Sequence, residues 1–248
     1  MLWCGVSYSQ QTIEPAGELE RGIALFEHGD TAGAVQTLES YVKKQKNDIA
    51  AWHYLGLSFG QLGNINDARK AHEKAARNGF QLVKNLLKGE TSPTELRRRF
   101  VPFIRDFTVA ADSAGKYLEL SPKLSDSKLS EWRKLGEHLR GYAEFSKELK
   151  DYRIYAPTEV TTKARILSKP SPMYTEDARR NQVTGMVALL LVFSADGSVR
   201  GFIPIKTLSM GLTETCIEAA RRIRFTPAMI NGTPVSQFIR VEYNFNIY

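Results

Sequence analysis

The sequence predicts two folded parts: an all-α stack of helical hairpins, and after it a small α+β domain with a three-stranded antiparallel sheet. Three observations lead to this prediction. Apolar residues recur at spacings of three and four, typical of helices, across residues 17–152. Part of that region repeats itself after 34 residues. In residues 169–248, a continuous apolar run and a strictly alternating segment are instead typical of β-strands.

Composition places the chain among ordinary globular proteins. Its 248 residues, 42% hydrophobic and 25% charged, suffice for two domains with cores of their own. No stretch approaches the roughly 18–20 uninterrupted apolar residues that span a bilayer. Two cysteines, Cys4 and Cys216, are too few for a disulfide framework or a four-ligand metal site. The net charge of +7 bears on solubility and on weak association with anionic surfaces, and it does not indicate a fold.

Residues 1–16 start with a short apolar stretch that gives way to small and polar residues. This pattern resembles the end of a secretory signal peptide, although the basic beginning and the usual apolar length are missing. Two interpretations stay open. Either residues 1–16 are a truncated signal peptide, or they are a disordered N-terminus.

Residues 17–152 contain a 34-residue repeat. A shift of 34 residues places Gly22 on Gly56 and Ala34 on Ala68. Small residues at these positions let two antiparallel helices approach closely, while larger apolar side chains fill the space between them. The second copy, from Trp52 onward, resembles the tetratricopeptide repeat. The residues that we expect to pack the repeats are Gly22, Ala34, Trp52, Leu55, Gly56, Phe59 and Ala68.

The resemblance is weaker outside these positions. His72 replaces the usual aromatic residue of the second copy, and Glu18 and Arg21 stand where the first copy should have Trp and Leu. A third unit, offset by 42 instead of 34 residues, is recognisable in Ala110, Ala114, Tyr117 and Pro122. We expect the extra residues around 89–93, where a Ser-Pro-Thr-Glu stretch predicts a helix start with a capping box. A long amphipathic helix over residues 129–149 is predicted to close the stack.

Residues 153–168 are polar, contain a proline and are interpreted as a linker. The remaining residues, 169–248, predict the order helix, strand, strand, helix, strand. An Asp-Gly pair at 196–197 is a strong hairpin signal between the first two strands. The expected elements are a helix at 175–182, strands at 185–193 and 199–205, a helix at 212–223, and a last strand at 238–247.

A series of short motifs runs in order through the last eighty or so residues. They are Pro172-x-Tyr174, Ala178-Arg179, Gly185-x-Val187, Asp196-Gly197-x-Val199, Ala219-Ala220, Arg224-Phe225-x-Pro227-Ala228 and Asn231-Gly232-x-Pro234-Val235. Together they resemble the C-terminal domain of TonB-family proteins. The sequence departs from that pattern at Thr175, where Pro is usual, and at Ile223, where Trp is usual. The membrane anchor and long proline-rich spacer of a complete energy transducer do not occur in this sequence.

The resemblance implies a non-enzymatic protein of the periplasm or cell envelope of a Gram-negative-type bacterium. In that family the last strand offers an open sheet edge to an extended segment of an outer-membrane receptor, which is β-augmentation. Carried over to this sequence, the partner-binding edge comprises Gln237, Phe238, Arg240, Glu242, Asn244 and Asn246. The alternative is that polar side chains merely protect this edge, or that it pairs within a homodimer.

No pattern in the sequence predicts catalysis, a cofactor or a metal. The histidines lie in the helical part without cysteines or paired carboxylates at ligand spacing; they are His28, His53, His72 and His138. We find neither a glycine-rich phosphate loop nor a nucleophile elbow. The basic clusters at 97–99 and 221–222 are too short to indicate a nucleic-acid partner.

The apolar run at 185–193 has a feature that the family resemblance does not explain. Its even-numbered residues are as apolar as its odd-numbered ones: Met186, Ala188, Leu190 and Val192. A strand with one face in water should alternate. We therefore expect the second face of the sheet to be covered, either by the helical part folding back or by another copy of the chain.

Two functions are compatible with the sequence. In the first, the chain is an adaptor or accessory protein in TonB-type transport across the outer membrane. Its repeats then hold a peptide or protein, and its last strand binds an extended segment of a receptor or envelope protein. In the second, the chain is a tetratricopeptide scaffold whose TonB-like domain only mediates dimerisation.

Overall fold

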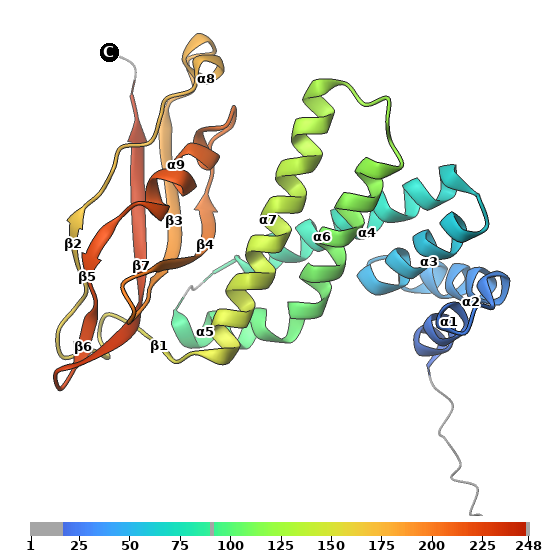
Figure 1. Ribbon diagram of the computed structural model, residues 1–248, viewed down its shortest axis with the longest axis horizontal. Coiled ribbons are helices and arrows are strands. Elements are labelled where there is room, and N and C mark those ends of the chain that lie inside the picture. The colour runs from blue at the N-terminus through green and yellow to red at the C-terminus, as the bar shows by residue number, and fades with distance from the viewer. Residues whose placement is uncertain (1–16, 90–91, 247–248) are drawn as a thin grey trace, which may run out of the picture.

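The computed structural model describes residues 17–89 and 92–246, with helices in the N-terminal part and a sheet-containing domain in the C-terminal part (Figure 1). This confirms the predicted order of a helical region followed by a sheet domain. Residues 1–16, interpreted as a leader or a disordered terminus, and Ile247 of the last strand lie outside the described residues. No helix in the described ranges combines the length and apolarity needed to cross a membrane.

The first four helices form two successive hairpins with the same turn. Gly29 and Gly63 adopt φ values of +85° and +76°, a region that favours glycine. The next residues, Asp30 and Asn64, cap the following helices through side-chain oxygens that accept backbone N–H groups. The second helices of the two hairpins begin 34 residues apart, at positions 31 and 65. The helices are α1 (Glu18–Glu27), α2 (Thr31–Lys44), α3 (Ile49–Gln61) and α4 (Ile65–Leu86).

The repeat spacing places close helix contacts at equivalent positions. A Cβ atom on Gly22 would lie 2.6 Å from Leu38 Cδ2, and one on Gly56 would lie 2.8 Å from the His72 ring. Leu38 and His72 are themselves 34 residues apart. The space beside the glycine is therefore filled by a leucine in the first hairpin and by a histidine in the second. Of the residues expected to pack the repeats, Gly22, Ala34, Leu55, Gly56 and Ala68 are buried, and Trp52 and Phe59 are half-buried.

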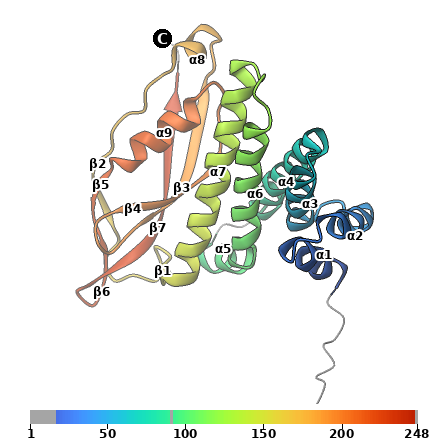
Figure 2. The same cartoon turned by 45° about the vertical axis from the view of Figure 1, so that its right-hand side comes forward.

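Three more helices and a short 3₁₀ turn complete the helical part. They are α5 (Pro93–Phe100), the turn η1 (Val101–Phe103), α6 (Ile104–Glu119) and α7 (Asp126–Asp151). α5 begins at the expected place, but the predicted capping box does not form because the Ser92 side chain accepts no cap hydrogen bond. The partner expected for it, Glu95, binds Arg98 and Arg99 instead. α7 is the predicted long helix, and it lies between α6 and the sheet (Figure 2).

The sheet has more strands than the sequence predicted, and they are not all antiparallel. The main sheet has the order β1-β7-β3-β4, with β6 also paired to β7, and β2 and β5 form a separate ribbon. β1 runs parallel to β7. The elements are β1 (Ile154–Tyr155), β2 (Arg165–Ser168), α8 (Glu176–Arg180), β3 (Gly185–Phe193), β4 (Val199–Lys206), α9 (Leu212–Arg221), β5 (Arg224–Thr226), β6 (Ala228–Ile230) and β7 (Thr233–Phe245).

The three predicted strands, β3, β4 and β7, are present and antiparallel, but the prediction missed the additional strands, for a physical reason. The additional strands are two to four residues long, which is too short to show alternation of apolar and polar side chains. Two of them, β1 and β2, lie within residues 153–168, which the sequence predicts to be a linker. Their pairing with β7 and β5 depends on contacts between distant residues, which local patterns do not encode.

Each face of the sheet packs against its own core. On one face α9 covers odd-numbered residues of β3 and β7, such as Leu191 and Val241. On the other face Leu190, Val192 and Phe238 pack against the helical part, where Phe145 of α7 is fully buried. The expected cover of the second face is thus supplied by the helical part folding back onto the sheet (Figure 2).

Candidate functional site

The outer side of β7 is only partly occupied by other strands. β1 pairs with residues 236–237 on the side of β7 opposite to β3, because Gln237 pairs with both strands, and β6 pairs with residues 233–235 at the start of β7. From residue 238 to residue 245, β7 pairs with β3 on its inner side, and no strand of the described chain pairs with its outer side. This unpaired stretch forms one edge of the main sheet, and the chain between β2 and α8 runs beside it (Figure 1).

The direction of the backbone groups on this edge follows from one hydrogen bond. The Glu242 carbonyl accepts a hydrogen bond from Lys169 Nζ at 3.0 Å, so it points away from β3. Backbone groups alternate in direction along a strand. The N–H and C=O groups of Arg240 and Asn244 therefore point outward with those of Glu242, and together they can pair with an added strand.

The opposite edge of the sheet, β4, is less suitable for pairing. Pro204 lacks a backbone N–H, and Gly201 has a φ of +60°. The register between β3 and β4 shifts at two places, whereas that between β3 and β7 is continuous over nine pairs. Bulges and prolines are devices that prevent edge pairing. β7 thus provides the regular free edge of the sheet.

A groove of about 370 Å³ runs beside the free edge, lined by residues of the segment 169–174 and by residues 242–246. Tyr174 fixes this segment, because its hydroxyl donates to the Val183 carbonyl at 2.7 Å and its ring contacts Phe245. The Lys169 ammonium group lies 5.0 Å from the centre of the Tyr243 ring. Burial raises the pKa of Tyr243 to about 12, so its hydroxyl stays neutral at physiological pH.

The residues assigned to the edge from the sequence fall into two groups. The exposed ones are Arg240, Glu242, Asn244 and Asn246. Arg240 and Glu242 form an ion pair with each other, with 2.7 Å between Nη2 and Oε1. The other two, Gln237 and Phe238, have buried side chains.

The burial of these two side chains has a structural cause. Gln237 pairs with β1, and its side-chain oxygen accepts the Ala164 N–H at 2.8 Å. Phe238 packs edge-on against Phe145 of α7. Sequence reasoning also missed Lys169, which has no periodic pattern around it and reaches β7 across 73 positions of the chain.

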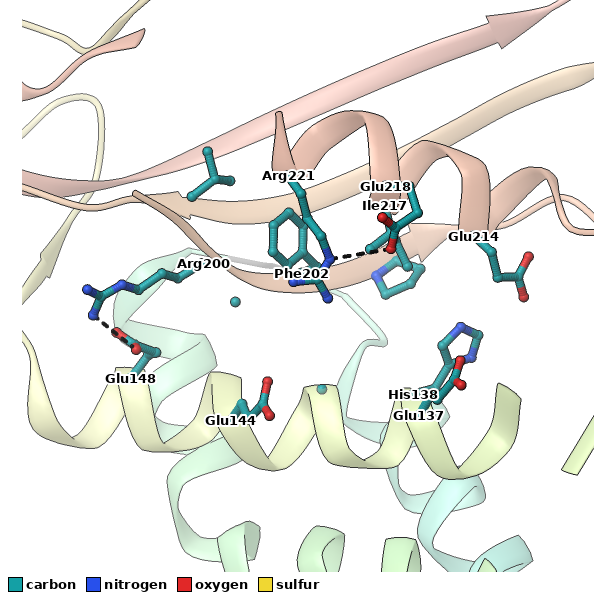
Figure 3. Close-up of a pocket in the computed structure, with 14 residues that line it drawn as sticks. Glu137, His138, Glu144, Glu148, Arg200, Phe202, Glu214, Ile217, Glu218 and Arg221 are labelled. Atoms are coloured by element: carbon teal, nitrogen blue, oxygen red, sulfur yellow. Dashed lines mark hydrogen bonds and ion pairs between the residues drawn. The ribbon is translucent and has the colours of Figure 1, made fainter. Parts of the chain in front are cut away.

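A second cleft, of about 350 Å³, lies between α7 on one side and β4 and α9 on the other (Figure 3). Two ion pairs join charged side chains of its lining. Arg200 of β4 reaches Glu148 of α7 at 3.5 Å, and Arg221 reaches Glu218 within α9 at 3.6 Å. Burial lowers the pKa of His138 at the cleft wall. Because an ion pair spans the cleft, we interpret it as part of the contact between the helices and the sheet.

Comparison with known families applies to the sheet-containing part. Residues 170–247 match the family model described as Gram-negative bacterial TonB protein C-terminal. The TonB resemblance of this part is thereby confirmed. The match begins after β2 and leaves the helices α1–α7 outside, so the tetratricopeptide resemblance stays a prediction. No curated protein matches the chain.

Proposed function

We propose that the chain is a non-enzymatic interaction protein of the periplasm, which binds an extended segment of another protein as an added strand on β7. The single observation that carries this proposal is the regular, unpaired outer edge at residues 240–245. The TonB-family match supports an outer-membrane receptor or another envelope protein as the partner. It also supports an adaptor or accessory role in TonB-type transport across the outer membrane.

Strand addition at this edge draws its affinity from main-chain hydrogen bonds. One N–H and one C=O group point outward at each of Arg240, Glu242 and Asn244. Of these groups, the Glu242 carbonyl already accepts a hydrogen bond from Lys169. Each new bond contributes about 1 kcal/mol net. The side chains of these residues then lie beside alternate side chains of the partner and contribute to its register. β1 limits the added strand to the part of β7 beyond residue 237.

Glu242→Pro is expected to weaken binding of a labelled peptide, copied from an extended periplasmic segment of an outer-membrane receptor, by about tenfold or more. The substitution removes an outward N–H group, whereas the ladder to β3 uses the groups that point inward. Fluorescence anisotropy measures the affinity, and thermal unfolding checks that the fold persists.

Glu242→Ala is the matched control, because it removes the same side chain and keeps the N–H group. Equal affinities for the proline and alanine variants, in folded proteins, would contradict strand addition. The same edge could instead pair with a second copy of the chain. In that case light scattering would show a dimer that Glu242→Pro converts to a monomer, and the scaffold interpretation would replace this proposal.

Lys169→Ala is expected to strengthen binding of the same peptide by about two- to threefold, because the lysine competes for the outward carbonyl of Glu242. The anisotropy titration that tests Glu242→Pro also measures this change. Lys163→Ala, a change in the segment that precedes β2, is the control and should leave the affinity unchanged. A weaker affinity for Lys169→Ala would show that the lysine assists the partner.

For the helical part we propose a tetratricopeptide-like stack that holds a second protein or peptide. The supporting observations are the two hairpins with equivalent turns and the glycine contacts 34 residues apart. We further propose a division into a helical domain at residues 17–152, a connection at 153–168 and a TonB-like domain at 169–248. The two domains share the core around Phe145, which supports their acting as one rigid unit.

A further inference from the structure

The helical part has a groove that the TonB-like function does not use. It lies over α3 between α2 and α4 and has a volume of about 620 Å³. α3 packs against both neighbouring helices. In Figure 1 α2 and α3 lie at the opposite end of the molecule from β7. Whatever binds this groove therefore does not compete directly with a strand added to β7.

The floor of this groove is apolar. It is formed by Val42, Trp52, Leu55 and Phe59. The Trp52 indole N–H donates to the Lys46 carbonyl at 2.8 Å, which orients the ring and satisfies its polar group. The floor can therefore contact apolar side chains of a ligand, and none of its four side chains offers a free polar group.

The rim of the groove is basic. It carries Lys43, Lys46, Lys70 and Lys74. Two carboxylates, those of Glu39 and Asp67, also line it. Lys70 is paired with Asp67 at 2.9 Å, and the other three lysines form no ion pair within the described part of the chain. The rim therefore has an excess of positive charge around an apolar floor.

We propose that this lysine-rimmed groove binds an acidic amphipathic helix of another protein. The apolar face of such a helix fills the floor, and its carboxylates face the lysines on both walls. Charge complementarity selects an acidic partner over a basic one. The apolar floor distinguishes the groove from a phosphate-binding surface, which would present donors along its base. This proposal rests on the partner binding proposed above for the helical part, and it does not depend on strand addition at β7.

The probe for this proposal is a synthetic helical peptide with leucine and phenylalanine at positions i, i+3, i+4 and i+7, and glutamate at the flanking positions. Fluorescence anisotropy at low salt should show saturable binding to the full chain. The double variant Lys43→Glu/Lys74→Glu should weaken it by about tenfold or more, because one reversed charge faces the peptide from each wall. Emission from Trp52 should shift to shorter wavelength on binding.

The matched control is Lys128→Glu/Lys147→Glu, which makes the same charge change at exposed positions of α7. It should leave the affinity nearly unchanged. Equal weakening by both double variants would overturn the proposal, since only overall charge would then matter. Equal binding of a peptide with lysine in place of glutamate would also overturn it. A third result would overturn the proposal as well: the chain binds vesicles with anionic headgroups but not the acidic peptide, and Lys43→Glu/Lys74→Glu abolishes the binding to vesicles.

Discussion

Replacing Phe145 with alanine is expected to lower the free energy of unfolding by about 3–5 kcal/mol. Phe145 is fully buried where α7 meets the sheet. Its ring lies 5.7 Å from that of Phe100 in the helical part and 6.0 Å from that of Phe238 on β7, between ring centres. Gly201 leaves the space that the ring occupies, because a Cβ atom there would lie 2.8 Å from Phe145 Cδ2. The substitution thus opens a cavity in the core that joins the two parts.

Urea unfolding followed by circular dichroism measures this change. Leu62→Ala is the control, because Leu62 is about half exposed at the end of α3, and its loss should cost about 0.5 kcal/mol or less. Limited proteolysis between α7 and β2 should also become faster in the Phe145 variant. A loss below about 1 kcal/mol would mean that the helical part does not depend on this contact with the sheet.

The second prediction is that acid destabilises the helical part through His72. This side chain is buried, and its Nδ1 has no hydrogen-bond partner in the described structure. Burial, with smaller effects of His53 and Lys116, lowers the pKa of His72 from 6.5 to about 4. The unfolded chain therefore binds the proton more tightly than the folded chain. Stability is fully present above pH 6.5 and is lost as the pH falls toward about 4.

The expected size of this loss is about 3 kcal/mol, since one pKa unit corresponds to about 1.4 kcal/mol. His72→Leu should remove it. Leucine fits the position, because Leu38 occupies the equivalent gap against Gly22 in the first hairpin. Urea unfolding at about pH 7.5 and about pH 4.5 measures the difference between the variant and the natural chain.

Leu38→His is the reciprocal control, because it places a histidine in the equivalent gap of the first hairpin. This variant should gain acid sensitivity. If His72→Leu kept the full acid loss of the natural chain, another buried group would be responsible. The next residue to test would be His53. Its ring centre lies 5.5 Å from that of His72, and burial also lowers the pKa of His53.

The proposed binding surfaces lie at opposite ends of the molecule, with α6 and α7 between them (Figure 1). One partner can then occupy the edge of β7 while another occupies the lysine-rimmed groove. Because α7 packs against both α6 and β4, the distance between the surfaces is held by a continuous core. This arrangement suits an adaptor, which must hold two proteins in a defined geometry.

The sequence alone determined the helices, the long strands and the TonB-like character of the last part. Helical periodicity, glycine turns and the 34-residue spacing act between residues close in the chain, so they can be recognised without coordinates. The apolar second face of β3 also predicted that something covers the sheet. His72 already stood out in the sequence as a departure from the repeat.

Only the tertiary structure decided which backbone groups of β7 remain free. β1 is two residues long and has no periodic pattern of its own. It follows α7 directly and pairs with Ser236 and Gln237, so these two residues of β7 are not available to a partner strand. Whether α7 or a second copy covers Leu190 depends on contacts between distant residues, which alternation along one strand does not reveal. The same holds for Lys169, whose position beside Glu242 arises from chain packing. Local patterns select the elements, and long-range packing selects the surfaces that those elements leave exposed.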